Sequence, residues 1–272
     1  MRPAATYVCN IPINRPMLHY SINPKYKEIE KHFSTIQKWF PEEGSTIYKI
    51  RNEIKVIELE GHRLCVKAFA PANPINRIVY AWLRKSKAKR SFLNAFKLQK
   101  LGIDTPEPLA WLEFRNRFGF LTHSYYISLY QEHAFTLAGV FGQKMAAKEE
   151  ILRDFAHFAW EQLHLKGVKH LDLGQGNVLV RPHTEKWHFS LVDINRMKFN
   201  QKGLRHRGFS NLRRLNASPI EMAMLASYYA EARQSNPLWG IIQLGWYKLR
   251  FQKLRNLRKS ITRPLKNMAF AS

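Results

Sequence analysis

The hydrophobic periodicity changes once along the chain, and this change restricts the folds that it can adopt. Apolar and polar residues alternate over residues 46–50 and 55–59, a turn follows at Glu60–His62, and residues 63–69 form a third β-type run. Such patterns predict three antiparallel strands. From Lys148 onward, apolar residues recur every three or four positions, which predicts helices. The pattern therefore favours an α+β chain that is rich in strands first and mostly helical afterwards.

The remaining elements follow from periodicity and from helix breakers. Helices are predicted over residues 24–40, 86–101 and 148–166, and further strands over residues 109–114, 120–129, 178–180 and 189–192. Gly102 and Gly167 lie where the second and third helices should end. We therefore expect two lobes with a cleft between them. The first, over residues 21–130, is a small antiparallel β lobe with one main helix, and the second, over residues 131–272, is mostly helical with a basic C-terminal helix. Residues 1–20 are expected to be an extension, either disordered or upstream of the true start.

Charge narrows the range of partners. The 272 residues include 44 Lys and Arg against 20 Asp and Glu, which gives a formal net charge of +24, and 45 % hydrophobic residues exclude a disordered chain. After Glu231 the sequence contains no acidic residue. Such a composition favours a polyanionic partner, which could be nucleic acid, anionic lipid or a phosphorylated glycolipid. Because no RRM, KH or zinc signature is present, no specific nucleic acid is expected.

The sequence gives no sign of secretion or of a membrane span. Residues 1–16 lack the apolar stretch of a signal peptide, and no run approaches the ~20 apolar residues that a span needs. Cys9 and Cys65 form neither a C-x-x-C pair nor a disulfide framework, which is typical of a reducing compartment. We expect a cytoplasmic protein that lies against a membrane face.

The clearest chemical motif is the stretch from His170 to Asn177, His-Leu-Asp-Leu-Gly-Gln-Gly-Asn, which fits H-x-D-x-x-x-x-N and directly precedes an apolar run. In a phosphoryl-transfer site, one carboxylate accepts the proton of the attacking hydroxyl, and an amide five residues later ligates a metal on the same phosphates. Asp172 and Asn177 have this spacing. In a purely structural interpretation, both residues form turns around the glycines and His170 is a buried, hydrogen-bonded histidine.

Two further residues complete the set that such a site needs. Lys67 lies on the third predicted strand, where its ammonium group can hold the α- and β-phosphates of a nucleotide. Asp193 directly follows the strand predicted over residues 189–192, where its carboxylate can bridge Mg²⁺ to the phosphates. The ordered set of Lys67, Asp172, Asn177 and Asp193 therefore favours phosphoryl transfer.

With these motifs, the sequence resembles the lipopolysaccharide kinase (Kdo/WaaP) family, whose fold is protein-kinase-like, and within it the branch found in Bacteroidetes. The resemblance runs from Ser21 to Tyr229 and rests on the stretches Ile22–Tyr26, Ile75–Tyr80, Ser86–Ser91, Leu101–Pro108, Gly176–Asn177 and Leu191–Phe199. The stretches that begin at Leu101 and Leu191 are typical of this family, whereas the H-x-D-x-x-x-x-N core is shared by all kinase-like folds.

The resemblance implies transfer of the ATP γ-phosphoryl group to an inner-core sugar, Kdo or heptose, on a lipid A precursor at the inner face of the inner membrane. It implies that Lys67 contacts the nucleotide phosphates, that Asp172 is the catalytic base, and that Asn177 and Asp193 hold Mg²⁺. ATP and Mg²⁺ are thus the expected cofactors. The expected partners are a lipid A-linked inner-core sugar and the anionic membrane surface.

Two features depart from the kinase pattern. The helix predicted over residues 86–101 contains no acid to pair with Lys67, and Leu93 or Asn94 occupies the expected place. No G-x-G-x-x-G precedes Lys67, and the tip between the first two strands reads Arg51-Asn-Glu. Either another residue orients Lys67 or the site is weakened, and side chains must cover the phosphates in place of glycine amides.

The basic C-terminal stretch and the acceptor leave alternatives open. The stretch Trp239–Lys266 mixes apolar residues with Lys and Arg, which fits either a packed helix with a solvated basic face or an interfacial helix that binds anionic lipid. The lack of a clear A-P-E element after Asp193 favours a non-peptide acceptor. The alternatives to a sugar kinase are an atypical, RIO-like protein kinase, a small-molecule phosphotransferase, and a non-catalytic, membrane-binding pseudokinase.

Overall fold

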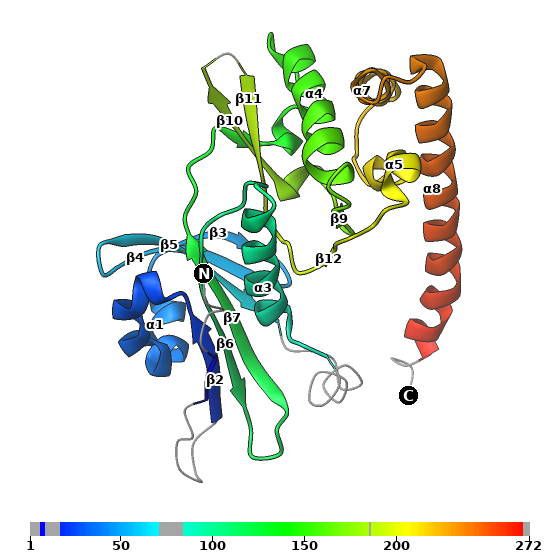
Figure 1. Cartoon of the computed structure of the whole chain (residues 1–272). Helices are drawn as coiled ribbons and strands as arrows, with labels where there is room; N and C mark the ends of the chain where they lie inside the picture. Colours follow the sequence, from blue (N-terminus) through cyan, green and yellow to red (C-terminus); the bar gives the residue numbers. More distant parts are fainter. Residues whose placement is uncertain (1–5, 9–16, 71–83, 185, 269–272) are drawn as a thin grey trace. The chain divides into compact units, whose positions relative to one another are not determined.

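The computed structural model describes residues 6–8, 17–70, 84–184 and 186–268. It divides into two compact units, which are described separately here: unit 1 comprises Met1–Glu132 and Leu191–Arg196, and unit 2 comprises His133–Ser190 and Met197–Ser272. Unit 1 is built mainly of strands and unit 2 mainly of helices (Figure 1), so the predicted α+β class is confirmed. The stretch Ile75–Tyr80, which contributes to the family resemblance, lies outside the described residues.

Unit 1 contains a seven-stranded antiparallel sheet with the strand order β1-β2-β6-β7-β5-β4-β3. The three strands predicted from alternation correspond to β3, β4 and β5, and the two predicted after the helix to β6 and β7. The bounds are Thr6–Val8 (β1), Met17–Ile22 (β2), Ser45–Lys49 (β3), Glu53–Leu59 (β4), His62–Phe69 (β5), Pro108–Arg115 (β6) and Leu121–Leu129 (β7).

The two faces of this sheet are covered by different helices. One face packs on the 3₁₀ helix η1 (Pro24–Thr35) and on α1 (Ile36–Glu42), and its core includes Leu64 and Val66 of β5. The other face packs on α3 (Lys87–Lys100), and its core includes Phe69 of β5. Because side chains alternate along a strand, Lys67 shares the α3 face with Phe69. The strand pattern thereby places the predicted phosphate-binding lysine beside the main helix.

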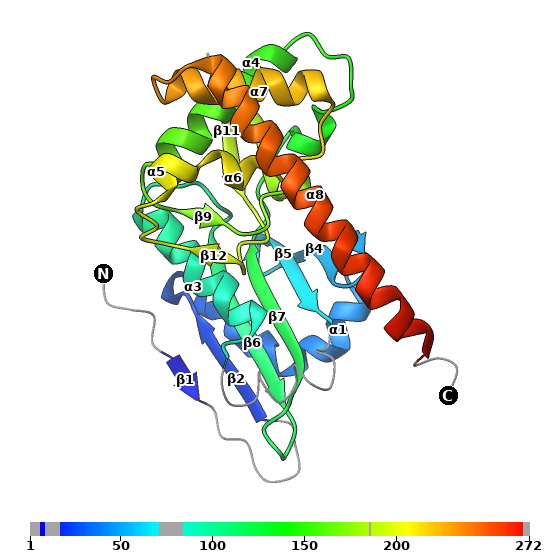
Figure 2. The ribbon, with the colours of Figure 1, turned by 90° about the vertical axis from the view of Figure 1, so that its right-hand side faces the viewer.

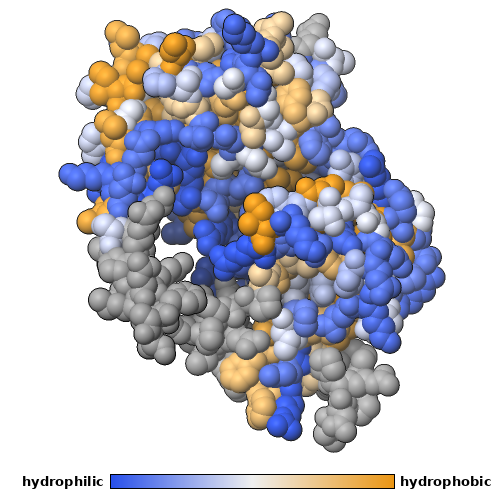
Figure 3. Space-filling model, turned by 180° about the vertical axis from the view of Figure 1, so that it is seen from behind, coloured by the Kyte–Doolittle hydropathy of each residue, from blue (hydrophilic) through white to orange (hydrophobic). Residues whose placement is uncertain are grey.

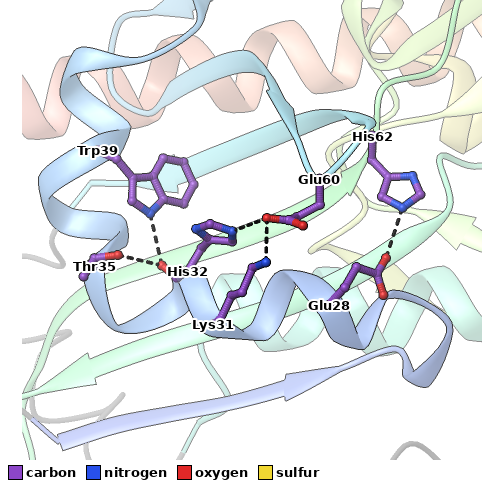
Figure 4. A network of polar contacts seen from close by, with 7 residues as sticks. All are labelled: Glu28, Lys31, His32, Thr35, Trp39, Glu60 and His62. Carbon is purple, nitrogen blue, oxygen red and sulfur yellow. Dashed lines mark hydrogen bonds and ion pairs between the residues drawn. The ribbon is translucent and has the colours of Figure 1, made fainter.

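A polar network joins η1 to the turn between β4 and β5 (Figure 4). His32 and Lys31 contact Glu60 at 2.7 and 3.0 Å, and His62 contacts Glu28 at 3.1 Å. The hydrogen bonds from His32 and Lys31 hold the pKa of Glu60 below its usual range. Glu60 itself has φ +50°, which the tight β4–β5 turn requires.

Unit 2 contains a helix with a π-helical end and two small sheets. The helix α4 (Lys148–His157) continues as the π-helix η3 (Phe158–His164), and two small sheets have the orders β11-β10-β8 and β12-β9. The strands are Phe135–Thr136 (β8), Lys169–His170 (β9), Val178–His183 (β10), Lys186–Leu191 (β11) and Met197–Lys198 (β12), and the shorter helices are Leu137–Gly139 (η2), Gln175–Asn177 (η4), Leu204–Arg207 (α5) and Phe209–Leu212 (α6). The predicted catalytic stretch thus occupies β9, a turn and η4.

Two longer helices complete unit 2. The helix α7 (Pro219–Ala232) begins with a capping box, in which Ser218 and Glu221 each bond the other's backbone N–H. The helix α8 (Pro237–Met268) is the longest in the described part of the chain and packs on α7 and α6 (Figure 2). Gly240 allows the close approach, because a Cβ there would lie 2.8 Å from Cβ of Ala230.

Several local predictions differ from the structure. The predicted helix over residues 24–40 is a 3₁₀ helix as far as Thr35, with a break in helical geometry at Tyr26 (φ −126°, ψ 35°), and becomes an α-helix only from Ile36. The predicted helix over residues 148–166 widens into η3, where Leu165 N–H bonds to Trp160 O. β2 was not predicted, because its burial does not alternate; it starts within the expected extension 1–20.

Candidate active site

The four predicted site residues fall into two groups, one in each unit. Lys67 and Asp193 belong to unit 1, because the segment Leu191–Arg196 is part of that unit. Asp172 and Asn177 belong to unit 2. The contacts of each group are described separately below.

Within unit 1, Lys67 and Asp193 form an ion pair although 126 positions separate them in the sequence. Lys67 Nζ lies 2.6 Å from Asp193 Oδ1, and the side chains are 12 % and 29 % exposed. Two hydrogen bonds fix the approach to Asp193: Thr105 Oγ1 donates to Leu191 O at 2.7 Å, and Leu191 N donates to Asp104 O at 3.0 Å. Asp193 is thus a carboxylate in contact with Lys67 that does not come from the main helix.

The backbone at Asp193 has an unusual conformation. Asp193 has φ +53°, in the left-handed region that non-glycine residues seldom adopt. The conformation is held because Asn195 Nδ2 donates to Asp193 Oδ1 at 2.7 Å, so that the carboxylate meets both an ammonium and an amide. Strained backbone of this kind persists where the surroundings fix it, and it is frequent at functional sites.

The helix α3 holds this segment through an amide in place of a carboxylate. Asn94, one of the two residues at the place where an acid was expected, donates from Nδ2 to the backbone O of Ile194 at 2.8 Å. The contact spans 100 positions in the sequence and joins α3 to the residue after Asp193. Asn94 therefore positions the Asp193 segment without pairing with Lys67.

Several cations gather near the Lys67–Asp193 pair. The ammonium groups of Lys67 and Lys87 lie 5.3 and 5.8 Å from the centre of the same Phe69 ring. Burial, together with the positive charges of Arg51 and Arg196, lowers the pKa of Lys87. Arg51 lies at the β3–β4 tip, which is tied to the end of β5 because Asn52 Oδ1 accepts from the N–H of Ala70 at 3.2 Å. Such a group of cations suits a polyanion such as a triphosphate.

In unit 2, the predicted base and the predicted amide lie on one tightly bonded loop. Asn177 Nδ2 donates to the backbone O of Asp172 at 2.9 Å, and Asp172 N donates to Nδ1 of His170 at 3.1 Å. His170 is fully buried. The loop thus has features of both interpretations made from the sequence. His170 is a buried histidine that supports the backbone, and none of these bonds within the loop uses the carboxylate of Asp172.

A buried network supports this loop from below. Asn211 Nδ2 donates to His170 O at 2.7 Å, His164 Nε2 lies 3.1 Å from Asn211 Oδ1, and His164 Nδ1 lies 2.6 Å from the hydroxyl of Tyr229. Because Asn211 Oδ1 can only accept, Nε2 of His164 carries the proton and Nδ1 accepts from Tyr229. Burial lowers the pKa of His164 to about 4 and raises that of Tyr229, so both are neutral.

Space beside this network is available only because residue 208 is glycine. A Cβ at Gly208 would overlap the hydroxyl of Tyr229 and lie 2.8 Å from Nδ1 of His164. The sequence offered no signal for the network, since its members come from η3, α6 and α7.

An arginine that sequence reasoning missed contacts the predicted base. Arg214 Nη1 donates to Asp172 Oδ1 at 2.8 Å, and both side chains are about one-third exposed (33 % and 35 %). Arg214 follows α6 and lies 42 positions after Asp172. No motif surrounds it, which explains why periodicity and spacing did not single it out.

The residues present fit a magnesium nucleotide. Mg²⁺ prefers carboxylate and amide oxygens, and Asp193 supplies the first kind. The amide nitrogen of Asn177 is engaged by Asp172 O, so its Oδ1 is directed away from that carbonyl. Among the residues that the structure describes, no three His, Cys, Asp or Glu side chains gather into a metal-binding group, so a zinc-type centre finds no support there.

Comparison with protein families gave a match. Residues 68–231 match the model of the "Lipopolysaccharide kinase (Kdo/WaaP) family", a range that begins directly after Lys67 and contains Asp172, Asn177 and Asp193. A comparison with curated proteins gave no match.

One solved structure is similar in fold. It is described as "WaaP in complex with acyl carrier protein", has a TM-score of 0.57 and 14 % sequence identity, and the alignment covers 86 % of this chain and 98 % of that one. At this identity the similarity shows the fold alone, and the protein-kinase-like fold expected from the sequence is confirmed. Since the family match also spans more than half of the sequence, the chain belongs to the lipopolysaccharide kinase (Kdo/WaaP) family.

Proposed function

We propose that the protein transfers the γ-phosphoryl group of ATP to a hydroxyl of an inner-core sugar, Kdo or heptose, on a lipid A precursor. The observation that carries the proposal is the 2.6 Å ion pair between Lys67 and Asp193, in a chain of the lipopolysaccharide kinase family. Kinase-like sites use a strand lysine and a carboxylate that follows another strand to bind the nucleotide phosphates and their Mg²⁺.

Each predicted residue has a distinct role in this reaction. Asp172 accepts the proton of the sugar hydroxyl while the oxygen of that hydroxyl attacks the γ-phosphorus. The bond between the γ-phosphorus and the β,γ-bridging oxygen breaks, which releases ADP. Lys67 contacts the α- and β-phosphates, and Asn177 and Asp193 hold Mg²⁺. When bound, Mg²⁺ neutralises charge on the phosphates.

Side chains replace a glycine-rich loop over the phosphates in this proposal. The β3–β4 tip reads Ile50-Arg51-Asn52 and contains no glycine whose amide could approach a phosphate closely. Lys87, which interacts electrostatically with Arg51, Lys67 and Asp193, supplies positive charge there together with Arg51. Charged side chains bind phosphate strongly, with guanidinium offering two parallel donors.

The acceptor is tested by a transfer assay with competing substrates. The protein, Mg²⁺ and γ-labelled ATP are incubated with a Kdo-bearing lipid A precursor, a heptose-bearing one, and a generic protein acceptor. We expect label on a glycolipid and none on the protein. Label on the protein would support the RIO-like protein kinase. In a parallel reaction with a free sugar as the acceptor, label on that sugar would support a small-molecule phosphotransferase. A chain that binds no Mg·ATP, seen as the absence of a thermal shift, would be a pseudokinase.

We further propose that α8 brings the enzyme to an anionic membrane, where a lipid-linked sugar is presented. The buried side of α8 faces α6 and α7, while its other side exposes Trp239, Ile242, Trp246 and Leu249, each more than half exposed. These residues recur every three or four positions and form one apolar stripe, called the outer stripe below. Hydrophobic surface gathers at the upper left of Figure 3, where α8 begins.

Charge on the same helix favours anionic lipid. The part of α8 that follows the first Trp contains Lys248, Arg250, Lys253 and Arg255 and no acidic residue. Each basic residue near an anionic leaflet contributes about 1 kcal/mol, and tryptophan side chains prefer the membrane interface. None of the helices in the described part of the chain has the length and hydrophobicity to cross a bilayer.

Vesicle binding tests the membrane proposal. The wild type should sediment with vesicles of phosphatidylglycerol mixed with phosphatidylcholine and should not sediment with pure phosphatidylcholine. The variant Trp246→Ser should bind at least about fivefold more weakly, since the burial of a large apolar side chain contributes about 1.5–3 kcal/mol. The control Phe118→Ser removes an aromatic side chain that is 61 % exposed on unit 1, and it should bind as the wild type does. Equal binding by both variants would contradict the role of the outer stripe.

A further inference from the structure

The loop that carries Asp172 has no cation of its own. Between Asp172 and Asn177 the sequence is Leu-Gly-Gln-Gly, which contains no cationic side chain. The partner comes from outside, since Arg214 Nη1 donates to Asp172 Oδ1 at 2.8 Å. A guanidinium–carboxylate bond is charge-assisted and directional, so it restricts rotation of the carboxylate more than a neutral hydrogen bond does.

The helix α8 in turn holds Arg214. The guanidinium group lies 5.1 Å from the ring centre of Phe251, on the inner side of α8, and Arg213 lies 5.4 Å from the same ring. The Nε atom of Arg214 is buried without a hydrogen-bond partner. The aromatic ring therefore takes part in orienting a group that its own hydrogen bonds do not fully fix.

The residues after Arg214 repeat the same arrangement. The backbone N–H of Asn216 donates to Gln175 Oε1 in the catalytic loop at 2.6 Å, and Lys248 Nζ of α8 donates to the backbone O of Leu215. Leu215 is fully buried. The segment 213–216, called the bridging segment below, thus contacts the catalytic loop through Arg214 and Asn216 and contacts α8 through Arg214 and Leu215.

We propose that Arg214 is a positioning residue for Asp172, and that α8 fixes it through Phe251. The proposal rests on the proposed function, because it takes Asp172 as the catalytic base. By binding Oδ1, Arg214 sets the rotation of the carboxylate and hence the direction from which it accepts the proton of the acceptor hydroxyl. Arg214 touches the base and is not itself required to touch ATP, so its loss acts on kcat and leaves the KM for ATP nearly unchanged.

Steady-state kinetics of four variants test the proposal. Arg214→Gln should lower kcat about 100-fold, the loss typical of a misplaced catalytic group, while the KM for ATP changes less than about threefold. Arg214→Lys keeps the charge and should recover part of that loss. Phe251→Leu should lower kcat about tenfold, and the double variant Arg214→Gln/Phe251→Leu should be no slower than Arg214→Gln alone, because both changes remove one contact.

A matched control comes from another exposed arginine of unit 2. Arg153 on α4 has the same two kinds of contact, since its guanidinium group lies 5.0 Å from the ring centre of Tyr228 and donates to Glu149 Oε1 at 3.1 Å. Arg153→Gln should keep the wild-type kcat. The proposal is overturned if Arg214→Gln has the wild-type kcat, or if the losses of the two single variants multiply in the double variant.

Hydrogen exchange separates failure of this proposal from failure of the proposed function. If the wild type transfers no phosphoryl group to any acceptor, the proposed function fails, and the exchange of the amides of residues 172–177 then decides whether the bridging segment holds the loop. Faster exchange there in Arg214→Gln and Phe251→Leu, with no change in Arg153→Gln, supports the positioning role. Unchanged exchange in both variants overturns it.

Discussion

The buried network beneath the catalytic loop can be tested by removing a single hydroxyl. In Tyr229→Phe the ring remains, but Nδ1 of His164, which accepts from that hydroxyl at 2.6 Å, loses its partner. Both side chains are fully buried, so no water replaces the hydroxyl without rearrangement. Since His164 reaches the backbone of His170 through Asn211, the change should be felt at the loop that carries Asp172.

The magnitude follows from the burial. A buried acceptor left without a donor costs about 1–3 kcal/mol, so we expect Tyr229→Phe to lose about 2 kcal/mol of stability. The neighbouring Tyr228 is the matched control, because its hydroxyl donates to Glu149 at 2.7 Å in an exposed contact. Tyr228→Phe should stay within about 0.5 kcal/mol of the wild type, as is usual for surface substitutions.

The assay is urea unfolding of both variants, followed by circular dichroism and combined with the transfer rate at saturating ATP. We expect Tyr229→Phe to unfold at lower urea and to lower kcat severalfold, whereas Tyr228→Phe should match the wild type in both measurements. If Tyr229→Phe were as stable and as active as the wild type, the network would not support the loop.

Three further outcomes follow from other contacts. Asn94→Ala removes the donor to Ile194 O and should weaken Mg·ATP binding by about tenfold, the equivalent of ~1.4 kcal/mol, as measured by calorimetry. Lys87→Met should weaken ATP binding more than adenosine binding. The control Lys89→Met removes another ammonium group of the same helix, 4.5 Å from the Trp111 ring, and should not have this effect. Burial holds the pKa of His164 at about 4 in the folded state. Between about pH 6.5 and pH 4 the unfolded state therefore binds the proton more readily, so the protein becomes less stable as the pH is lowered. From pH 7 to pH 5 this residue should account for a loss of ~2 kcal/mol in the free energy of unfolding. The free energy of unfolding of His164→Gln should therefore fall less steeply over this range, and a fall identical to that of the wild type would refute the prediction.

The strands and the main helix of unit 1 could be predicted because their sequences carry clear local signals. Apolar and polar residues alternate through most of β4 and β5. The helix α3 begins with a Ser86 cap and ends before Gly102, whose φ is +66°. Lys67 and Asp193 could be chosen as candidates because Lys67 lies on a predicted strand and Asp193 directly follows another. Their contact across 126 positions depends on the Leu191–Arg196 segment joining unit 1, which no local pattern encodes.

The residues that sequence reasoning missed act through single long-range contacts. Arg214 meets Asp172 from a segment between short helices, and its neighbours show no periodicity that points to the loop. Tyr229 reads as an ordinary apolar position of α7, and only the structure shows its hydroxyl on His164. Leu93 or Asn94 was expected at the place of a missing acid, but the bond of Asn94 to a backbone carbonyl is a tertiary feature.

The predicted division of labour between the two carboxylates, Asp172 as base and Asp193 as metal ligand, is the centre of the account. The most direct test measures Mg·ATP binding and phosphoryl transfer to the glycolipid in parallel for Asp172→Asn and Asp193→Asn. The account predicts that Asp172→Asn binds Mg·ATP like the wild type yet loses at least about 100-fold in transfer, whereas Asp193→Asn loses Mg·ATP binding itself. Transfer at the wild-type rate by Asp172→Asn, or unchanged Mg·ATP binding by Asp193→Asn, would contradict it.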